Sequence, residues 1–514
     1  MRKIEIDLRP EEYFNEELRI QTIARKMGVQ AADITHAEVT KRSLDSRRGI
    51  TYHTTAEVYM SGEQWEMPDY RGHYQDCTYG KPVVVAGAGP AGLFAALRLL
   101  ELGYKPVIVE RGKDVTRRKL DIAQMAREGK VNSQSNWCYG EGGAGTFSDG
   151  KLFTRSTKRG NVAQVLQYFV SHGADRNIMI DAHAHIGTDR LSGIISNIRE
   201  TIMEYGGEYH FESQITDLII RNGQATGVRT AQGECIEGIA VILATGHSAR
   251  DIYELFHAKH WALEAKPFAL GVRVEHPQSL INAIQYHTKD YSPLLPPASY
   301  SLTTQVGSHG VFSFCMCPGG VIVPASTGDG QQVVNGMSNS KRNSPFANSG
   351  IAVTVGLEDV PQYGKYEELA LLRFQEAVER KVWEAAGGCI KAPSQRLTDF
   401  CENKGANRLN KSNYMGECAP CKIQEVLPPF VVSCLQQGFR DFGRKMKGFY
   451  TEEASILAVE SRTSSPVRIP RGSDLQHIQI KGLYPCGEGA GYAGGIVSSA
   501  MDGIHCAEQI SKVL

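Results

Sequence analysis

A short apolar stretch that runs directly into a glycine-rich turn constrains the fold of this chain more than any other feature. Residues Val83–Ala86 are apolar, and they lead into the turn Gly87–Gly92, which reads Gly-Ala-Gly-Pro-Ala-Gly. Leucines at helical spacing follow, and a second apolar stretch, Pro106–Val109, ends at Glu110. Because a strand, a glycine turn, a helix and a second strand occur in this order, the sequence predicts a Rossmann-like β-α-β unit.

The residues of this turn suit the binding of a dinucleotide. Gly87 permits a tight turn, Gly89 lets a pyrophosphate approach the backbone, and Gly92 allows the helix to pack closely against the strand. The helix N-terminus offers free N–H groups to phosphates. Glu110 stands where a carboxylate accepts the hydroxyls of the adenosine ribose, and Arg111 is a candidate to stack on adenine. The predicted cofactor residues of this unit are Gly87, Ala88, Gly89, Pro90, Ala91, Gly92, Glu110 and Arg111.

Two later segments favour FAD over NAD. An apolar stretch, Ala240–Leu243, closes on Ala244–Gly246, and Gly482–Gly491 reads Gly-Leu-Tyr-Pro-Cys-Gly-Glu-Gly-Ala-Gly before a C-terminal helix. This arrangement resembles the two-dinucleotide-fold flavoproteins of the glutathione reductase and p-hydroxybenzoate hydroxylase kind. In those proteins the acid of the Gly-Glu or Gly-Asp turn binds the ribityl chain of FAD, which is the place of Glu488. The helix beginning near Gly495 would direct its N-terminus at the flavin.

Longer motifs extend the resemblance along nearly the whole chain. Asn132–Asn136, Gly140–Leu152, Ser461–Arg468 and the Gly-Glu-Gly-Ala-Gly segment together resemble a family of uncharacterised FAD-dependent dehydrogenases. The resemblance implies the fold and FAD as the cofactor, but no substrate. In the flavoproteins that it resembles, the loop corresponding to Glu141–Gly150 wraps the isoalloxazine ring and the pyrophosphate. The further cofactor residues that the resemblance implies are Gly143, Gly145, Thr146, Ile215, Ala244, Thr245, Gly246, Gly487, Glu488, Gly494, Gly495 and Ile496.

The chain is long enough for several domains, and its patterning divides it into four segments. Residues 1–79 hold an alternating stretch, a helical stretch and two more strand-like stretches, which predicts a small N-terminal β-α-β-β module with a structural or docking role. Residues 80–265 and 476–514 form a predicted α/β, Rossmann-like FAD-binding domain. Residues 266–475 form a predicted β-rich (α+β) insertion that faces the substrate.

Several elements of the inserted domain are predicted from its patterning. A turn at Pro318–Gly320 favours a hairpin between Val311–Met316 and Val321–Ala325, and Gln332–Met337 would continue the same sheet. The remaining predicted elements are strands at Phe268–Glu275 and Tyr300–Val306, and helices at Tyr366–Ala386 and Val431–Phe442.

A few residues of the insertion are candidates for catalysis. Cys315 and Cys317 lie two apart on a predicted strand, so both side chains point to one face, where they would act as thiols or simply pack. Arg273 and His276 stand at a strand end and would serve as an anion clamp or a proton donor. Arg462 would bind a carboxylate substrate through both nitrogens. The pair Cys418 and Cys421 has redox spacing, but no second pair completes a zinc site, so we predict no metal.

The composition narrows the functional classes. The 514 residues carry 56 Lys and Arg against 56 Asp and Glu, so no overall charge attracts nucleic acid or an acidic membrane surface. The chain shows no apolar stretch approaching about 18 residues and no signal-peptide pattern, so we expect no membrane span. Twelve cysteines without a secretion signal favour free thiols and a cytoplasmic location.

These observations predict an FAD-dependent oxidoreductase. Its flavin would move a hydride or two electrons at N5, with a small molecule as substrate or a protein as electron donor. One alternative is an FAD-dependent monooxygenase that uses O₂. A second is a flavin-containing binding or scaffold protein that acts through its N-terminal module.

Overall fold

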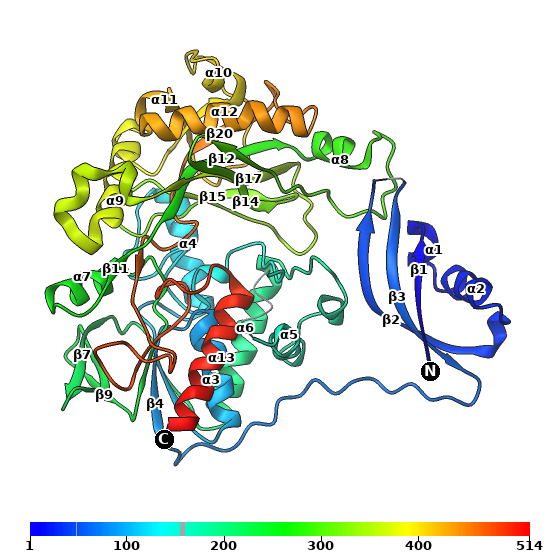
Figure 1. The fold of residues 1–514 in the computed structure, drawn as a ribbon, viewed down its shortest axis with the longest axis horizontal. Helices are drawn as coiled ribbons and strands as arrows, with labels where there is room; N and C mark the ends of the chain where they lie inside the picture. The colour runs from blue at the N-terminus through cyan, green and yellow to red at the C-terminus, as the bar shows by residue number, and fades with distance from the viewer. Residues whose placement is uncertain (48, 155–159, 514) are drawn as a thin grey trace.

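The computed structural model describes residues 1–47, 49–154 and 160–513, and its N-terminal part is a three-stranded antiparallel sheet (Figure 1). The strand order is β1-β3-β2, and two helices pack on one face of the sheet around Tyr13, Ile23 and Tyr52. The predicted β-α-β-β order is present, except that two helices stand in place of the one predicted helical stretch. Its elements are β1 (Arg2–Leu8), α1 (Pro10–Phe14), α2 (Glu16–Met27), β2 (Ile34–Asp45) and β3 (Thr51–Met60).

A five-stranded parallel sheet, in the order β22-β10-β4-β5-β6, forms the centre of the next part, which we call the nucleotide lobe. Its strands are β4 (Pro82–Ala86), β5 (Lys105–Val109), β6 (Glu208–His210), β10 (Val241–Leu243) and β22 (Leu483–Pro485). The helices α3 (Pro90–Glu101), α5 (Val162–Ser171), α6 (Thr188–Glu204) and α13 (Ile496–Val513) cover one face of the sheet (Figure 1). The other face packs against β7 (Ile215–Arg221), β8 (Gln224–Thr230), β9 (Cys235–Glu237) and α7 (Arg250–Ala258).

This sheet is assembled from two distant parts of the sequence. Strand β22, near the C-terminus, pairs in parallel with β10, and β10 pairs in parallel with β4. The carboxyl ends of β4, β5, β10 and β22 therefore meet at one edge, where ligands bind in open α/β sheets. This arrangement confirms the predicted Rossmann-like fold class.

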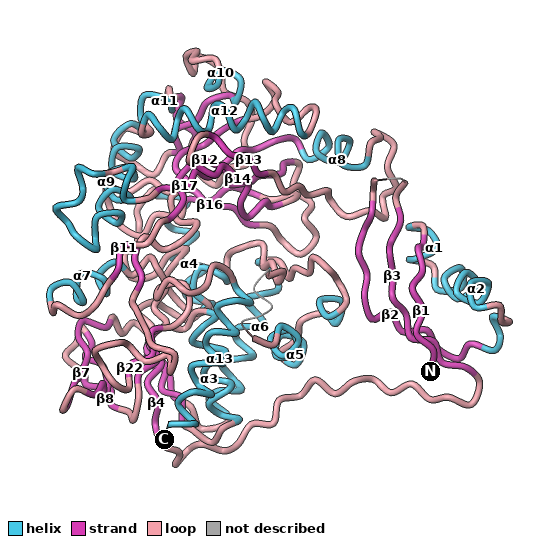
Figure 2. The backbone as a smooth tube through the Cα atoms, in the orientation of Figure 1, coloured by secondary structure: helices cyan, strands magenta, loops and turns pink. Residues whose placement is uncertain are grey.

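A seven-stranded sheet, in the order β13-β14-β17-β12-β20-β18-β19, lies between β11 (Glu264–Ala265) and β21 (Val467–Arg468) in the chain, and we call this part the inserted lobe (Figure 2). Its strands are β12 (Phe268–Pro277), β13 (Thr303–Val306), β14 (His309–Cys317), β17 (Phe346–Val355), β18 (Ala392–Arg396), β19 (Cys418–Pro420) and β20 (Ser455–Glu460). The helices that accompany it are α8 (Gln278–Tyr286), α9 (Ala370–Ala385), α10 (Leu397–Cys401), α11 (Ile423–Val426) and α12 (Pro429–Lys445). Helix α4 (Val115–Glu128) follows β5 in the nucleotide lobe, and its residues Ile122 and Met125 form a small apolar cluster with Val323 of the inserted lobe.

The predicted hairpin around Pro318–Gly320 is wrong. Strand β14 already has β13 on one side and β17 on the other, so no edge is free for the next strand. The chain turns away at Gly319, which has a φ of +48°. Strand β15 (Val321–Pro324) pairs instead with β16 (Val334–Met337) in a separate two-stranded sheet, so Gln332–Met337 does not continue the main sheet.

The other predicted elements of the insertion differ from the structure mainly at their ends. The strand predicted at Tyr300–Val306 begins at Thr303, and the helix predicted at Tyr366–Ala386 begins at Ala370 after a 3₁₀ turn. No helix of the described residues is long and apolar enough to cross a bilayer.

Candidate functional site

The glycine turn after β4 leaves an open space at the N-terminus of α3. Gly87 has a φ of +107°, and a Cβ there would lie 2.5 Å from the Ala244 carbonyl oxygen. A Cβ at Gly89 would instead meet only the Gly143 Cα, at 3.9 Å. The turn therefore packs against the protein at Gly87 and leaves space beside the backbone at Gly89. A backbone that binds a pyrophosphate requires such a space.

Glu110 fixes the second side of this site. Its side chain is nearly buried, and its carboxylate accepts hydrogen bonds from the N–H groups of Ala88 at 2.9 Å, Gly112 at 2.8 Å and Gly140 at 3.0 Å. The carboxylate thus joins the turn after β4, the end of β5 and the loop before Glu141. It lies at the sheet edge where the sequence predicts a ribose-binding acid.

A cavity opens beside Glu110 at the carboxyl ends of β4 and β10, and we call it the adenosine pocket after the group that the sequence predicts Glu110 to bind. Two predicted residues outside the β4–β5 unit, Ile215 and Thr245, line it. Arg111 also lines the pocket, with its guanidinium 4.4 Å from the centre of the Tyr139 ring and paired with Asp251. The lining residues are Gly87, Val109, Glu110, Arg111, Tyr139, Ser213, Ile215, Thr245, Ala249 and Ile252.

Five of these lining residues were not predicted as cofactor residues, and Val109 among them was predicted only as the end of the second strand. Tyr139 lies between two recognised motifs, and its hydroxyl donates a hydrogen bond to the Ser248 carbonyl. Ala249 and Ile252 follow the predicted Thr-Gly turn within a few residues, so that turn was a signal for them. Ser213 has no sequence signal, because only the pairing of β5 with β6 brings it to Glu110.

A buried arginine beneath the glycine-rich loop has one unused nitrogen. Arg118 has no exposed surface, and it donates to the carbonyls of Asn136 at 2.8 Å, Gly140 at 3.2 Å and Glu141 at 2.8 Å. Its Nη2 has no hydrogen-bond partner among the described residues. A buried donor without a partner is costly, and an anionic group at this loop would remove that cost.

The same loop brings three of the implied cofactor residues together. A Cβ on Gly145 would lie 3.3 Å from Pro90 Cγ and 3.4 Å from Ile496 Cγ1, so the loop touches the N-termini of both α3 and α13. Gly494 and Gly495 precede α13, and added Cβ atoms there would meet nothing closer than 3.9 Å. The turn and the loop therefore fit FAD: Gly89, Gly494 and Gly495 have room beside their backbones, and a buried donor at this loop lacks a partner.

The Gly-Glu turn after β22 closes the site from the other side. The Gly487 N–H donates to Asp502 Oδ2 at 2.7 Å, and the Glu488 carboxylate lies 3.5 Å from His247 Nδ1. The Gly489 backbone packs on Gly246, and a Cβ added at Gly489 would lie 2.8 Å from backbone atoms of Gly246. The ends of β10 and β22 thus hold Glu488 beside the Thr-Gly turn.

Two candidate catalytic residues, Arg273 and His276, lie in the core of the inserted lobe. Arg273 is fully buried, and its Nη1 is 3.0 Å from Glu460 Oε2. His276 is also fully buried, and its Nε2 hydrogen-bonds to the Phe449 carbonyl at 2.8 Å. Burial lowers the pKa of His276 to about 4. Arg273 is thus engaged by internal partners, whereas His276 is bonded through Nε2 alone and its buried Nδ1 has no partner among the described residues.

The two cysteines of β14 do not share a face, which corrects the sequence prediction. The register with β17 shifts between Phe314 and Cys317, and Cys315 has a φ of +44° at this bulge. The bulge breaks the alternation of side chains, so Cys315 is exposed whereas Cys317 is buried. Cys315 keeps accessible surface, but many protein atoms surround its thiol and disfavour the thiolate, which raises its pKa to about 12. All twelve cysteines, Cys418 and Cys421 included, lie in the described residues and are free thiols.

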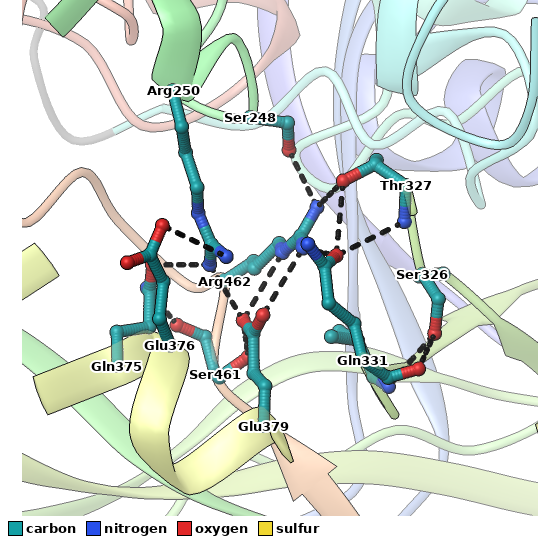
Figure 3. Close-up of polar contacts among 12 residues, drawn as sticks. Ser248, Arg250, Ser326, Thr327, Gln331, Gln375, Glu376, Glu379, Ser461 and Arg462 are labelled. Carbon is teal, nitrogen blue, oxygen red and sulfur yellow. Dashed lines mark hydrogen bonds and ion pairs between the residues drawn. The ribbon is translucent and has the colours of Figure 1, made fainter. Parts of the chain in front are cut away.

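Arg462, the last candidate, belongs to a buried polar network between the two lobes (Figure 3). It donates to Thr327 Oγ1 at 2.9 Å, to Gln331 Oε1 at 2.7 Å and to Ser248 Oγ at 3.1 Å. Its guanidinium also pairs with Glu379 at 3.2 Å. These partners use the nitrogens that the sequence analysis assigned to a substrate carboxylate.

Two groups of three possible metal ligands occur among the described residues. In one, Asp502 lies with Cys486 and Cys506, and in the other, Glu368 lies with His257 and Glu367. Arg471 Nη2 pairs with Asp502 at 2.6 Å, and His257 pairs with Glu368 at 2.8 Å. Arg471 therefore already engages a ligand of the first group, whereas in the second group the two paired residues are themselves possible ligands.

The fold and this site define a Rossmann-type flavoprotein with an inserted sheet lobe. Residues 267–463 match a family described as FAD-dependent protein, C-terminal domain-like, and residues 1–59 match a domain of unknown function, DUF8436. The chain is 40% identical over 509 residues to an uncharacterised protein of Clostridium beijerinckii (strain ATCC 51743 / NCIMB 8052), with 95% of this chain and 94% of that protein covered. The chain belongs to the same family as this uncharacterised protein. FAD is its cofactor, and a flavin supplies oxidation and reduction, so the protein is an FAD-dependent oxidoreductase.

Solved structures resemble the chain only distantly. A geranylgeranyl bacteriochlorophyll reductase-like protein of Thermoplasma acidophilum is 12% identical, with a TM-score of 0.37, and covers 84% of this chain and 78% of its own. A 2,6-dihydroxypyridine-3-hydroxylase of Arthrobacter nicotinovorans is 11% identical, with a TM-score of 0.39, and covers 84% of both chains. These similarities are too low to transfer an activity.

Proposed function

We propose that the protein transfers a hydride or two electrons between its flavin and a small molecule or an electron-donor protein. The observation that carries the proposal is the shared sheet edge, where the open turn at Gly89, the carboxylate of Glu110 and the adenosine pocket meet. Bound FAD would supply hydride or electron transfer at N5. The adenosine pocket would hold the adenosine end, and Glu488 would hold the ribityl chain.

Residues of this chain would orient the cofactor and balance its charge. The N-terminus of α3 would face the phosphates above the buried Arg118, while Gly494 and Gly495 would leave the N-terminus of α13 open to the ring. The free cysteines support a reducing compartment, for which we propose the cytoplasm.

Identification of the bound flavin tests this assignment. The purified protein should be yellow and should release FAD on heating, because FMN has no adenosine for Glu110 and the adenosine pocket to hold. Chromatography of the released flavin distinguishes the two. If FMN alone is released, the adenosine pocket is wrongly assigned.

A second candidate function, compatible with the inserted seven-stranded sheet, is that of an FAD-dependent monooxygenase. Turnover under ¹⁸O₂ would distinguish the two activities, once a substrate is found. Label in the product indicates a monooxygenase, whereas turnover with another acceptor in the absence of O₂ indicates a dehydrogenase. A flavin that dithionite cannot reduce without unfolding would favour the binding or scaffold function.

A further inference from the structure

A buried carboxylate from the inserted lobe reaches the nucleotide lobe beside the adenosine pocket. Glu379 lies on α9 without exposed surface, and three residues donate to its carboxylate (Figure 3). Arg250 Nη2 donates to Oε1 at 2.8 Å, Ser461 Oγ donates to Oε1 at 2.7 Å, and Arg462 Nη2 lies 3.2 Å from Oε2. Arg250 begins α7 of the nucleotide lobe, so this carboxylate joins the two lobes.

The contacts continue from this carboxylate to the pocket wall. Arg462 Nη1 donates to Ser248 Oγ at 3.1 Å, and the Ser248 carbonyl accepts the hydroxyl of Tyr139. Tyr139 and Ala249 line the adenosine pocket. One carboxylate therefore holds, through two arginines, the segment that forms one wall of the pocket.

Both arginines depend on Glu379 for their charge balance. Burial opposes the ionisation of Glu379, but the guanidiniums of Arg250 and Arg462 outweigh it and lower its pKa to about 2. Arg250 Nε and Nη1 have no hydrogen-bond partner in the described part of the chain. The other nearby carboxylate, Glu376, lies 3.7 Å from Arg250 Nη1, which is beyond hydrogen-bond distance, and its side chain is 31% exposed. Without Glu379, both buried cations would lose their principal counter-ion.

We infer that Glu379 is a positioning residue for FAD. Acting from the inserted lobe, it holds the Ser248–Arg250 segment and Tyr139 in place, so that the adenosine pocket is complete only when the lobes are docked. This inference rests on the proposed function, because it assumes that FAD places its adenosine in that pocket.

The test compares FAD with FMN on the full-length protein after flavin exchange. Glu379→Gln should raise the Kd for FAD by about tenfold or more and leave the Kd for FMN within about twofold, because FMN does not reach the pocket. Glu376→Gln is the matched control, and it should leave both constants unchanged. A structural role alone would weaken both flavins equally, and that result would overturn the inference.

A double variant covers the case in which Glu379→Gln does not fold. Adding Arg250→Met removes one unpaired cation, which should restore folding but not FAD affinity. Recovery of the wild-type Kd for FAD in this variant would refute the positioning role. Equal affinities of the wild-type protein for FAD and FMN would instead refute the adenosine pocket itself, so the two failures can be told apart.

Discussion

Single glycines and single buried polar groups determine how this protein receives its cofactor. At Gly89 an added Cβ finds free space in the protein, whereas at Gly92 it would lie 1.9 Å from the Gly87 carbonyl oxygen. The first position is therefore constrained by the ligand, and the second by the packing of the helix on the strand. This difference separates variants that lose the cofactor from variants that lose the fold.

Gly89→Val should abolish FAD binding and leave the fold intact. An added Cβ fits the protein, and the valine methyls would occupy the approach of the phosphates, so we expect the free energy of unfolding without cofactor to change by less than about 1 kcal/mol. Flavin absorbance and thermal unfolding measure the two effects. Gly364→Val, at an exposed position with equal space, is the control and should purify yellow.

Because of His276, the stability of the inserted lobe should decrease as the pH is lowered from 6.5 to 4. The pKa of His276 in the folded protein is about 4, below the ordinary 6.5, so the unfolded chain binds the proton first as pH falls. Above pH 6.5 the histidine is neutral in both the folded and the unfolded chain, so it does not change the free energy of unfolding. Between pH 6.5 and 4 about 3 kcal/mol of that free energy is lost. His276→Gln, unfolded by denaturant across this range, should lose that dependence.

Other groups titrate in the same range, so the difference between wild type and variant is the relevant quantity. Burial raises the pKa of Glu275 to about 7, which acts in the opposite direction in both proteins. The exposed linker histidine His73 gives the control, His73→Gln. A pH-independent difference between wild type and His276→Gln would show that His276 does not titrate as described.

At the scale of elements, the close contact between α3 and α13 supports the glycine turn Gly87–Gly92. The two helices approach so closely that a Cβ on Gly503 would lie 2.0 Å from the Ala91 carbonyl oxygen. Ala91 belongs to the glycine turn itself. The C-terminal helix therefore determines how the first turn of α3 presents its N–H groups.

Gly503→Ala should force these helices apart. We expect a loss of about 1–3 kcal/mol in the free energy of unfolding, together with weaker FAD retention. Gly193→Ala is the matched control on α6, where the added Cβ meets nothing within 4 Å. It should be neutral or stabilising, because alanine reduces the entropy of the unfolded chain. Equal effects of the two substitutions would refute the close contact.

At the scale of the whole molecule, the N-terminal module binds both lobes. Arg42 Nη2 donates to Asp181 Oδ2 at 2.9 Å in the nucleotide lobe, and Arg176 pairs with Glu38 at 2.8 Å. Leu44 packs against the core of the inserted lobe. In Figure 1 a long connection leads from this module back to β4.

Deletion of residues 1–60 should leave a yellow protein that unfolds at a lower temperature. All residues of the adenosine pocket begin at Gly87, so FAD should be retained, while the contacts of Arg42 and Leu44 are lost. Deletion of residues 1–79 should be more harmful, since it also removes the buried Cys77, whose N–H donates to the Tyr205 carbonyl. A colourless product of the shorter deletion would place the module within the cofactor site.

Reduction by NADH or NADPH alone should be slow and weakly saturable. In the described residues, only one sheet has the successive parallel strands and glycine turn of a dinucleotide-binding unit, and the proposed FAD site uses it. The flavin absorbance after anaerobic mixing with each nucleotide measures the rate. Fast reduction that saturates at micromolar nucleotide would reveal a nicotinamide site that this sheet does not provide.

The sequence by itself determined the cofactor turn, Glu110 and the Rossmann-like fold class. These features lie within one continuous stretch, where the order of strand, glycine turn and helix follows from local backbone preferences. The longer motifs added the family of FAD-dependent proteins. The inserted sheet was predicted less well, because its strands have no local mark that selects their partners.

Only the tertiary structure decided which polar side chains remain available for chemistry. His276 and Arg462 have the residue types of catalytic groups, but each is buried against partners more than 80 residues away or in the other lobe. The bulge at Cys315 arises from pairing with β17 and reverses the direction predicted from alternation. Partners for a buried charge are set by long-range packing, so no local pattern in the sequence could reveal that Glu379 joins the two lobes.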